Sequence, residues 1–146
     1  MYGSVQTISW CYVTLIAVSG GPMHKIAIIE DVEDNRDLLY YMLHDEFEVT
    51  RFSSGEEALQ HFTGDSPDLI VLDIWLPGMD GVEVLNRVRQ DEHLRKIPVL
   101  ALTANAMSGD REKYLSAGFD EYASKPIANV VEFVRIVRRL LIPGQH

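Results

Sequence analysis

Polar and charged side chains follow the ends of four short runs of strand-forming residues in this chain. Glu30 and Asp31 follow KIAII, Asp73 follows LIVL, Thr103 follows VLAL, and Lys125 follows EYAS. Runs of this kind are typical of buried parallel strands, whose carboxyl ends meet at one edge of a sheet. Three carboxylates, a hydroxyl and an ammonium group gathered there predict a site for a cation and a phosphoryl group.

The three carboxylates predict a magnesium site. Crowded acids repel one another and raise one another's pKa, and a hard divalent cation relieves that repulsion. Glu30 and Asp31 alone could serve as caps of the following helix, but Asp73 on the adjacent strand favours the metal site. The main-chain carbonyl of Trp75 is a further candidate ligand. Its side chain is expected to flank the entrance to the site or to pack on the loop surface.

Asp73 has the chemistry of a nucleophile toward phosphorus, which would give an acyl phosphate beside a charge-neutralising Mg²⁺. The hydroxyl of Thr103 is suited to hydrogen-bond a phosphoryl oxygen, although Thr is common in strands for its propensity alone. Lys125 is expected to pair with Asp73 or with a phosphoryl group rather than to be a solvated charge. The Lys125–Pro126 bond is a candidate cis peptide.

Alternating apolar and amphipathic segments predict how these residues are positioned. They indicate an α/β fold of the flavodoxin-like, doubly wound type, a five-stranded parallel sheet of order 2-1-3-4-5 with helices on both faces. The predicted strands are Ile26–Ile29, Glu48–Phe52, Leu69–Leu72, Val99–Leu102 and Glu121–Ala123. The predicted helices are Asp34–Asp45, a segment from the capping residue Ser54 to His61, Gly81–Gln90, Ser108–Ala117 and Val130–Leu141.

Length and composition exclude several classes of function. The 146 residues suit one domain, with 47% hydrophobic and 24% charged residues. A formal net charge of −9 argues against direct DNA binding, since phosphate backbones require a basic surface. Cys11 is the single cysteine, so no internal disulfide forms, and a reducing, cytoplasmic location is expected. The histidines show no metal-ligand pairing.

Residues 1–22 differ from the rest, because no charged side chain precedes Lys25. Their apolar stretch is shorter than the ~18 residues of a membrane helix, and a secretory signal would need a basic start. We expect an N-terminal extension there, from an upstream start codon or from cloning, and one domain over residues 23–146 that begins at Met23. The alternative is a hydrophobic arm that pairs with a sheet edge or a second subunit.

From Lys25 to Leu141 the chain resembles a response-regulator receiver domain of two-component signalling. The family's acidic pair falls on Glu30 and Asp31, and the aspartate of its D-x-x-x-P-x-M-D-G string on Asp73. Its threonine after the fourth strand falls on Thr103, and its K-P pair begins at Lys125. In this family an aromatic switch residue lies on the fifth strand, at the position of Tyr122. No site residue departs from the family pattern.

The resemblance implies a phosphoacceptor signalling domain rather than an enzyme, one that catalyses only its own phosphorylation and dephosphorylation. Asp73 would take a phosphoryl group from a sensor histidine kinase or a histidine phosphotransfer protein. Asp31 would be the principal metal ligand and Glu30 would orient water or metal. Thr103 and Lys125 would move toward the phosphoryl oxygens, and Tyr122 would rotate inward to change the surface of the fourth helix and fifth strand.

No output module is visible after the last helix, so we expect a single-domain regulator that acts by docking to a downstream protein, without membrane contact. The strings DNRDLL, TANAMSGD and YASKPI are most similar to cell-cycle regulators and to receivers of hybrid kinases. Three arginines of the last helix form either a small docking patch or a solvated face: Arg135, Arg138 and Arg139.

Other functions fit the sequence less well. A phosphoaspartyl hydrolase usually carries a second acid two residues after its nucleophile, where this chain has Trp75. A pseudo-receiver that only docks to proteins would predict a damaged site, and this one is complete. A flavin-binding module would need loops rich in Gly, Ser and Thr rather than acids.

Overall fold

A computed structural model describes residues 23–104 and 109–142. The strands are β1 (Lys25–Ile29), β2 (Glu48–Phe52), β3 (Leu69–Asp73), β4 (Val99–Thr103) and β5 (Glu121–Ser124). The helices are α2 (Glu33–Leu43), α3 (Gly55–Phe62), α4 (Gly81–Gln90), α5 (Asp110–Ala117) and α6 (Val130–Leu141). All strand pairs are parallel, in the order β2-β1-β3-β4-β5, which confirms the predicted flavodoxin-like fold.

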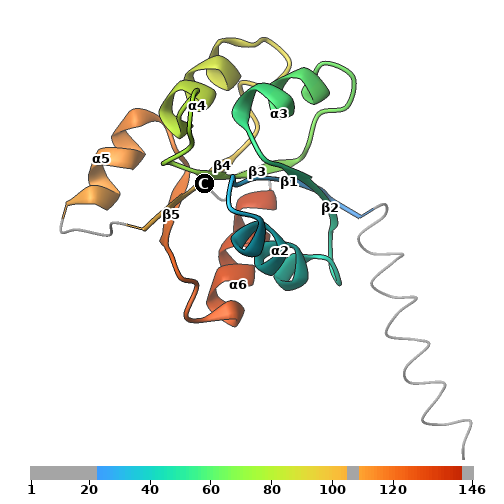
Figure 1. Ribbon diagram of the computed structural model, residues 1–146, viewed down its shortest axis with the longest axis vertical. Coiled ribbons are helices and arrows are strands. Elements are labelled where there is room, and N and C mark those ends of the chain that lie inside the picture. The colour runs from blue at the N-terminus through green and yellow to red at the C-terminus, as the bar shows by residue number, and fades with distance from the viewer. Residues whose placement is uncertain (1–22, 105–108, 143–146) are drawn as a thin grey trace, which may run out of the picture.

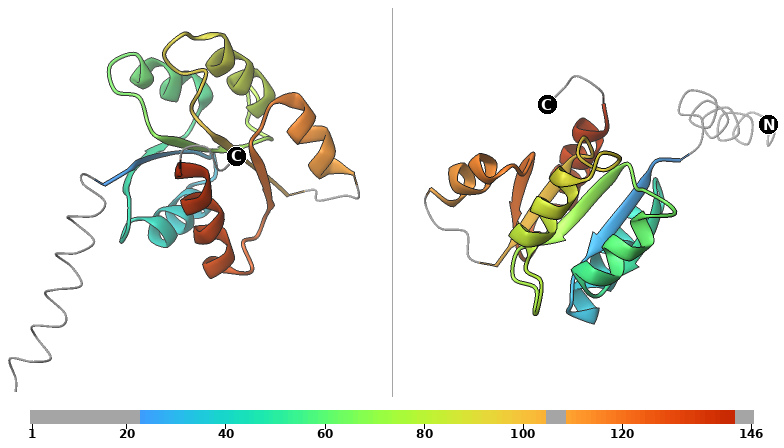
Figure 2. Two further views of the ribbon diagram at one scale, coloured as in Figure 1. Left: turned by 180° about the vertical axis from the view of Figure 1, so that it is seen from behind. Right: turned by 90° about the horizontal axis from the view of Figure 1, so that it is seen from above.

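The helices cover both faces of this sheet. Helices α2 and α6 lie on one face, and α3, α4 and α5 lie on the other (Figure 1). The view from behind shows the same layers, and the view from above looks onto α3 and α4 in front of the strands (Figure 2). Because both faces are covered, β3 and β4 are buried at every position, whereas the edge strand β2 is buried only at Phe52.

Two hydrophobic clusters fill the spaces between sheet and helices, and alternate residues of each strand point into one or the other. Ile26 and Ile28 of β1 face the layer of α2 and α6, where Leu43 and Leu140 are also buried. Ala27 and Ile29 face the opposite layer. That second layer also contains Phe62, Leu72, Val84, Leu85 and Tyr114.

Element boundaries follow the predictions with small shifts. The first helix begins one residue earlier and ends two earlier than predicted. Ser54 accepts a hydrogen bond from the Glu57 N–H and caps α3, as its sequence pattern predicts. Helix α5 ends against Gly118, whose φ of 116° is in the left-handed region. Its predicted start at Ser108, like the expectations for residues 1–22, lies outside the described residues.

The loop between β3 and α4 is held tightly at both ends. Ile74 N–H donates to Leu102 O at 2.9 Å, and Gly81 N–H donates to Ile74 O at 2.9 Å. A Cβ atom at Gly81 would lie 2.6 Å from the main-chain oxygen of Asp73, so only glycine permits this approach. The start of α4 therefore packs directly on the end of β3. Among the described helices, none has the length and apolar character needed to cross a membrane.

Candidate acidic site at the carboxyl edge of the sheet

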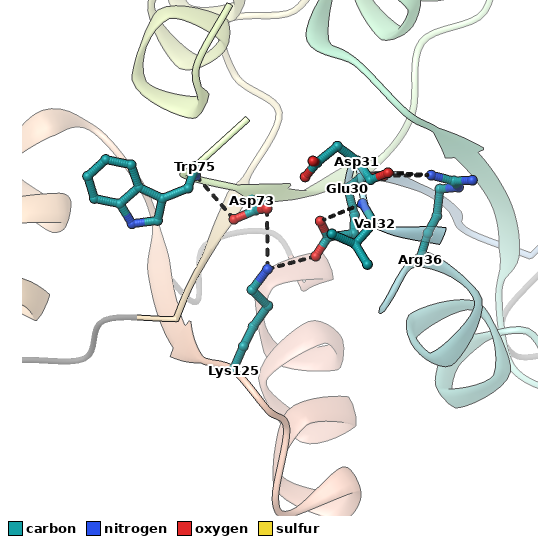
Figure 3. A network of polar contacts seen from close by, with 7 residues as sticks. All are labelled: Glu30, Asp31, Val32, Arg36, Asp73, Trp75 and Lys125. Atoms are coloured by element: carbon teal, nitrogen blue, oxygen red, sulfur yellow. Dashed lines mark hydrogen bonds and ion pairs between the residues drawn. The ribbon is translucent and has the colours of Figure 1, made fainter. Parts of the chain in front are cut away.

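Three strands bring charged groups together at the carboxyl edge of the sheet. Glu30 directly follows β1, Asp73 is the last residue of β3, and Lys125 directly follows β5. Lys125 Nζ lies 2.8 Å from Glu30 Oε1 and 3.2 Å from Asp73 Oδ2, as Figure 3 shows. The Lys125–Pro126 peptide bond is cis, as predicted. The contact with Asp73 agrees with the sequence prediction, whereas the shorter contact with Glu30 was not predicted.

The three carboxylates predicted as metal ligands form one cluster. Glu30, Asp31 and Asp73 each place a carboxylate oxygen within 4.8 Å of the other two. Glu30 and Asp73 are almost fully buried, at 0% and 2% exposed, and Asp31 is the accessible member. This is the only such cluster of metal-ligating side chains in the part of the chain that the structure describes.

Main-chain N–H groups orient two of the carboxylates. Trp75 N–H donates to Asp73 Oδ1 at 3.2 Å, and Val32 N–H donates to Glu30 Oε2 at 3.3 Å. The Trp75 side chain is 61% exposed and points away from the acidic cluster, in agreement with a surface position beside the site (Figure 3). The assignment of its main-chain carbonyl as a metal ligand stays a prediction.

The charged groups of this cluster shift one another's pKa. Burial raises the pKa of Glu30 to about 7; the hydrogen bond from Lys125 opposes this rise, and neighbouring Asp73 adds to it. Burial by itself would lower the pKa of Lys125, but the hydrogen bond to Glu30 and the charge of Asp73 raise it above its ordinary value. Lys125 is therefore a permanent cation among the acids, and it compensates their negative charge only in part.

Thr103 and Tyr122 lie on the α5 side of this site. Thr103 is fully buried at the end of β4, and its carbonyl accepts a hydrogen bond from Lys125 N–H at 2.8 Å. Tyr122 pairs with Ala101 in the sheet, so it lies on the same face as Thr103. The Tyr122 ring stacks on that of Tyr114 with centroids 5.7 Å apart. The structure thus keeps Tyr122 outside the acidic cluster, packed between β5 and α5.

One residue at the site has no counterpart in the sequence predictions. Arg36 in α2 donates from Nη1 to the main-chain carbonyls of Glu30 and Asp31. Its position near the start of a helix with acidic first-turn residues gave no indication of this contact. The nearest available signal was the separation of 6 and 5 residues between the acidic pair and this arginine.

The fold and the acidic site together define a receiver domain. The family model for the response regulator receiver domain matches residues 26–138, and the chain belongs to this family. Response regulators with such domains act in two-component signalling. Receiver domains are signalling domains rather than enzymes in the usual sense.

Curated and solved relatives agree with this assignment. The chain is 41% identical over 118 residues to the polar-differentiation response regulator DivK of Brucella ovis, covering 80% of this chain and 95% of DivK. The receiver domain of the sensor histidine kinase PA1611 from Pseudomonas aeruginosa, solved with a magnesium ion coordinated in its active site cleft, is 34% identical. Its TM-score is 0.74, with 82% of this chain and 98% of that chain covered.

A chemotaxis protein has the same fold. CheY4 of Vibrio cholerae is 25% identical and has a TM-score of 0.74, with 81% of this chain and 98% of that chain covered.

Proposed function

We propose that this chain is a response regulator that accepts a phosphoryl group on Asp73 from a phosphohistidine. The donor would be a sensor histidine kinase or a histidine phosphotransfer protein. The observation that carries the proposal is the placement of the Asp73 carboxylate at the sheet edge, in contact with Lys125 and within 4.8 Å of two further acids. A carboxylate with a purely structural role would not be expected to lie among several further charged groups.

In the proposed transfer, one carboxylate oxygen of Asp73 forms a bond to phosphorus while the P–N bond to the donor imidazole breaks. The electron pair of that bond stays on the imidazole nitrogen, which then takes a proton from solvent. Lys125, already 3.2 Å from Asp73 Oδ2, pairs with a phosphoryl oxygen after transfer. The Trp75 N–H, which holds Asp73 Oδ1, fixes the orientation of the attacking carboxylate.

Glu30, Asp31 and Asp73 suit a bound Mg²⁺. Their carboxylate oxygens are close enough to share one cation, and oxygen ligands of this kind are those that Mg²⁺ prefers. When bound, the ion supplies positive charge that neutralises phosphoryl oxygens and the crowded acids. The main-chain carbonyl of Trp75 is a candidate fourth protein ligand. The related Pseudomonas receiver with a coordinated magnesium ion supports this assignment.

The output would be a change in a protein-binding surface. Thr103, whose side chain is on the same sheet face as Tyr122, would move toward the phosphoryl group and leave space for the Tyr122 ring. Rotation of that ring breaks its stacking on Tyr114 and alters the surface of α5 and β5. A downstream protein in the cytoplasm reads this surface, and direct DNA binding is not expected from a chain of net charge −9.

The decisive experiment is phosphorylation by acetyl phosphate, with and without Mg²⁺, followed by intact-mass analysis. The wild type should gain one phosphoryl group only with Mg²⁺, and Asp73→Asn should gain none. Asp45→Asn is the matched control, because the Asp45 side chain is 91% exposed and remote from the cluster. A phosphorylated histidine phosphotransfer domain is the second donor. Absence of transfer from both donors would refute the proposal and favour a phosphorylation-independent docking module.

A further inference from the structure

Arg36 directs its guanidinium group at the backbone that carries the acidic pair. Nη1 lies 2.9 Å from the carbonyl oxygen of Glu30 and 3.4 Å from that of Asp31. The side chain is half-buried. Figure 3 shows its guanidinium group beside the turn between β1 and α2. One cation therefore ties together the two consecutive peptide units from which Glu30 and Asp31 project.

The Glu30 carboxylate is itself held by Val32 N–H and by Lys125, whereas the backbone of the turn has few other contacts. Directly after β1, Glu30 N–H donates to Phe52 O of β2 at 3.1 Å. Val32 occupies the N-cap of α2 and provides no side-chain cap. Arg36 N–H closes the first helical turn on Val32 O at 2.9 Å. Arg36 thus fixes the turn through its main chain and its side chain together.

The guanidinium group of Arg36 contacts backbone carbonyls rather than an acidic side chain. Within residues 23–104 and 109–142 Arg36 forms no ion pair with a carboxylate, and its guanidinium group donates to the two backbone carbonyls. The carbonyl oxygens that it binds set the peptide planes at Glu30 and Asp31. Those planes determine the directions in which both side chains leave the backbone.

We propose that Arg36 is a positioning residue of the metal site, which holds Glu30 and Asp31 in the geometry that binds Mg²⁺. This inference rests on the proposed role of these two acids as metal ligands. Groups that orient metal ligands typically change metal affinity about 10- to 100-fold when they are replaced. Arg36 acts through hydrogen bonds to the backbone of the ligands, without touching the ion.

Charge and geometry predict opposite effects at this position. A positive charge near the site opposes cation binding, so if Arg36 acted by charge alone, its removal would tighten Mg²⁺ binding. If Arg36 positions the ligands, its removal weakens binding. A single nitrogen, Nη1, makes both carbonyl contacts. Lysine keeps the charge, but its ammonium group is on a shorter, flexible side chain that does not reach the position of Nη1, so Arg36→Lys should weaken binding as well.

The test is Mg²⁺ affinity measured by calorimetric titration of Arg36→Met, Arg36→Lys and the wild type. Fluorescence of Trp75 in a Trp10→Phe background is a second measurement, since the main-chain N–H of Trp75 donates to Asp73 Oδ1. We expect both variants to bind Mg²⁺ about ten-fold more weakly. Arg51→Met is the matched control: Arg51 lies on β2 and pairs with Asp37, so the same charge is lost without loss of the carbonyl contacts.

Two results would overturn the inference: wild-type affinity in Arg36→Lys, or tighter binding in Arg36→Met. Thermal unfolding of each variant shows whether it is folded; if Arg36→Met is not, Arg36→Lys decides alone. Saturable binding to the wild type with unchanged variants rejects only the role of Arg36. Absence of Mg²⁺ binding to the wild type rejects the proposed metal site and this inference with it.

Discussion

Ionisation of Glu30 should destabilise the metal-free protein as the pH rises. Its carboxyl group loses its proton near the ordinary value of 4.5 in the unfolded chain and at about 7 in the folded protein. Because the folded pKa is the higher one, this contribution to stability is fully present below the unfolded pKa. It is lost as the pH rises through the folded pKa.

The size of the effect follows from the two pKa values. The full shift corresponds to about 3 kcal/mol, and most of it is lost between roughly pH 5 and pH 8. Lys125 remains charged over this window because its pKa is raised, so it does not contribute to the change. Glu30→Gln removes the titrating group and keeps a side chain of similar size.

The assay is urea unfolding of wild type and Glu30→Gln in the presence of EDTA at several pH values. The difference in unfolding free energy between the two proteins should change by about 2 to 3 kcal/mol in favour of Glu30→Gln between about pH 5 and pH 8. Glu92→Gln is the matched control, because Glu92 is exposed, and its curve should run parallel to wild type. Millimolar Mg²⁺ at the higher pH should restore stability to the wild type far more than to Glu30→Gln.

Parallel pH curves for wild type and Glu30→Gln would refute the reasoning, since they would mean that Glu30 has the same pKa in both states. A wild-type unfolding free energy that rises with pH relative to that of Glu30→Gln would refute the reasoning more strongly. That result would require a lowered pKa, with Lys125 dominating over burial.

Three further substitutions test the local structure. Ser54→Ala removes the cap of α3 and should lower the unfolding free energy by about 1 kcal/mol in urea titrations. Ser54→Asn should retain most of the stability, because Asn is also a good cap. Equal losses in the two variants would exclude the cap. Gly81→Ala forces a Cβ atom against the main-chain oxygen of Asp73. It should lower the unfolding free energy by roughly 2 kcal/mol or more and reduce phosphorylation of Asp73. An unchanged melting temperature would contradict the close approach. Leu100→Ala leaves a cavity in the fully buried β4 and should cost about 2–5 kcal/mol, while Leu38→Ala, at a position 50% exposed, should cost much less.

Much of the fold was predictable because apolar periodicity reports burial directly. The runs before Asp73 and Thr103 are continuous and strand-forming, as required for strands covered on both faces. The common location of these groups was predictable for the same reason: each charged or hydroxyl group follows such a run, and parallel strands end at a common edge. Ser54 was predictable as a cap because capping is local, involving residues only three positions apart.

Tertiary structure alone decided how these groups interact. Lys125 and Glu30 are separated by most of the chain, and their 2.8 Å contact depends on the order in which β1, β3, β4 and β5 lie in the sheet. The raised pKa of Glu30 depends on burial by neighbouring elements, which a residue type does not encode. The contact of Arg36 with two backbone carbonyls depends on the path of the turn between β1 and α2. Sequence by itself therefore determined which groups reach the edge of the sheet. Packing determined their partners and their charge, because distance and solvent exposure are properties of the folded chain.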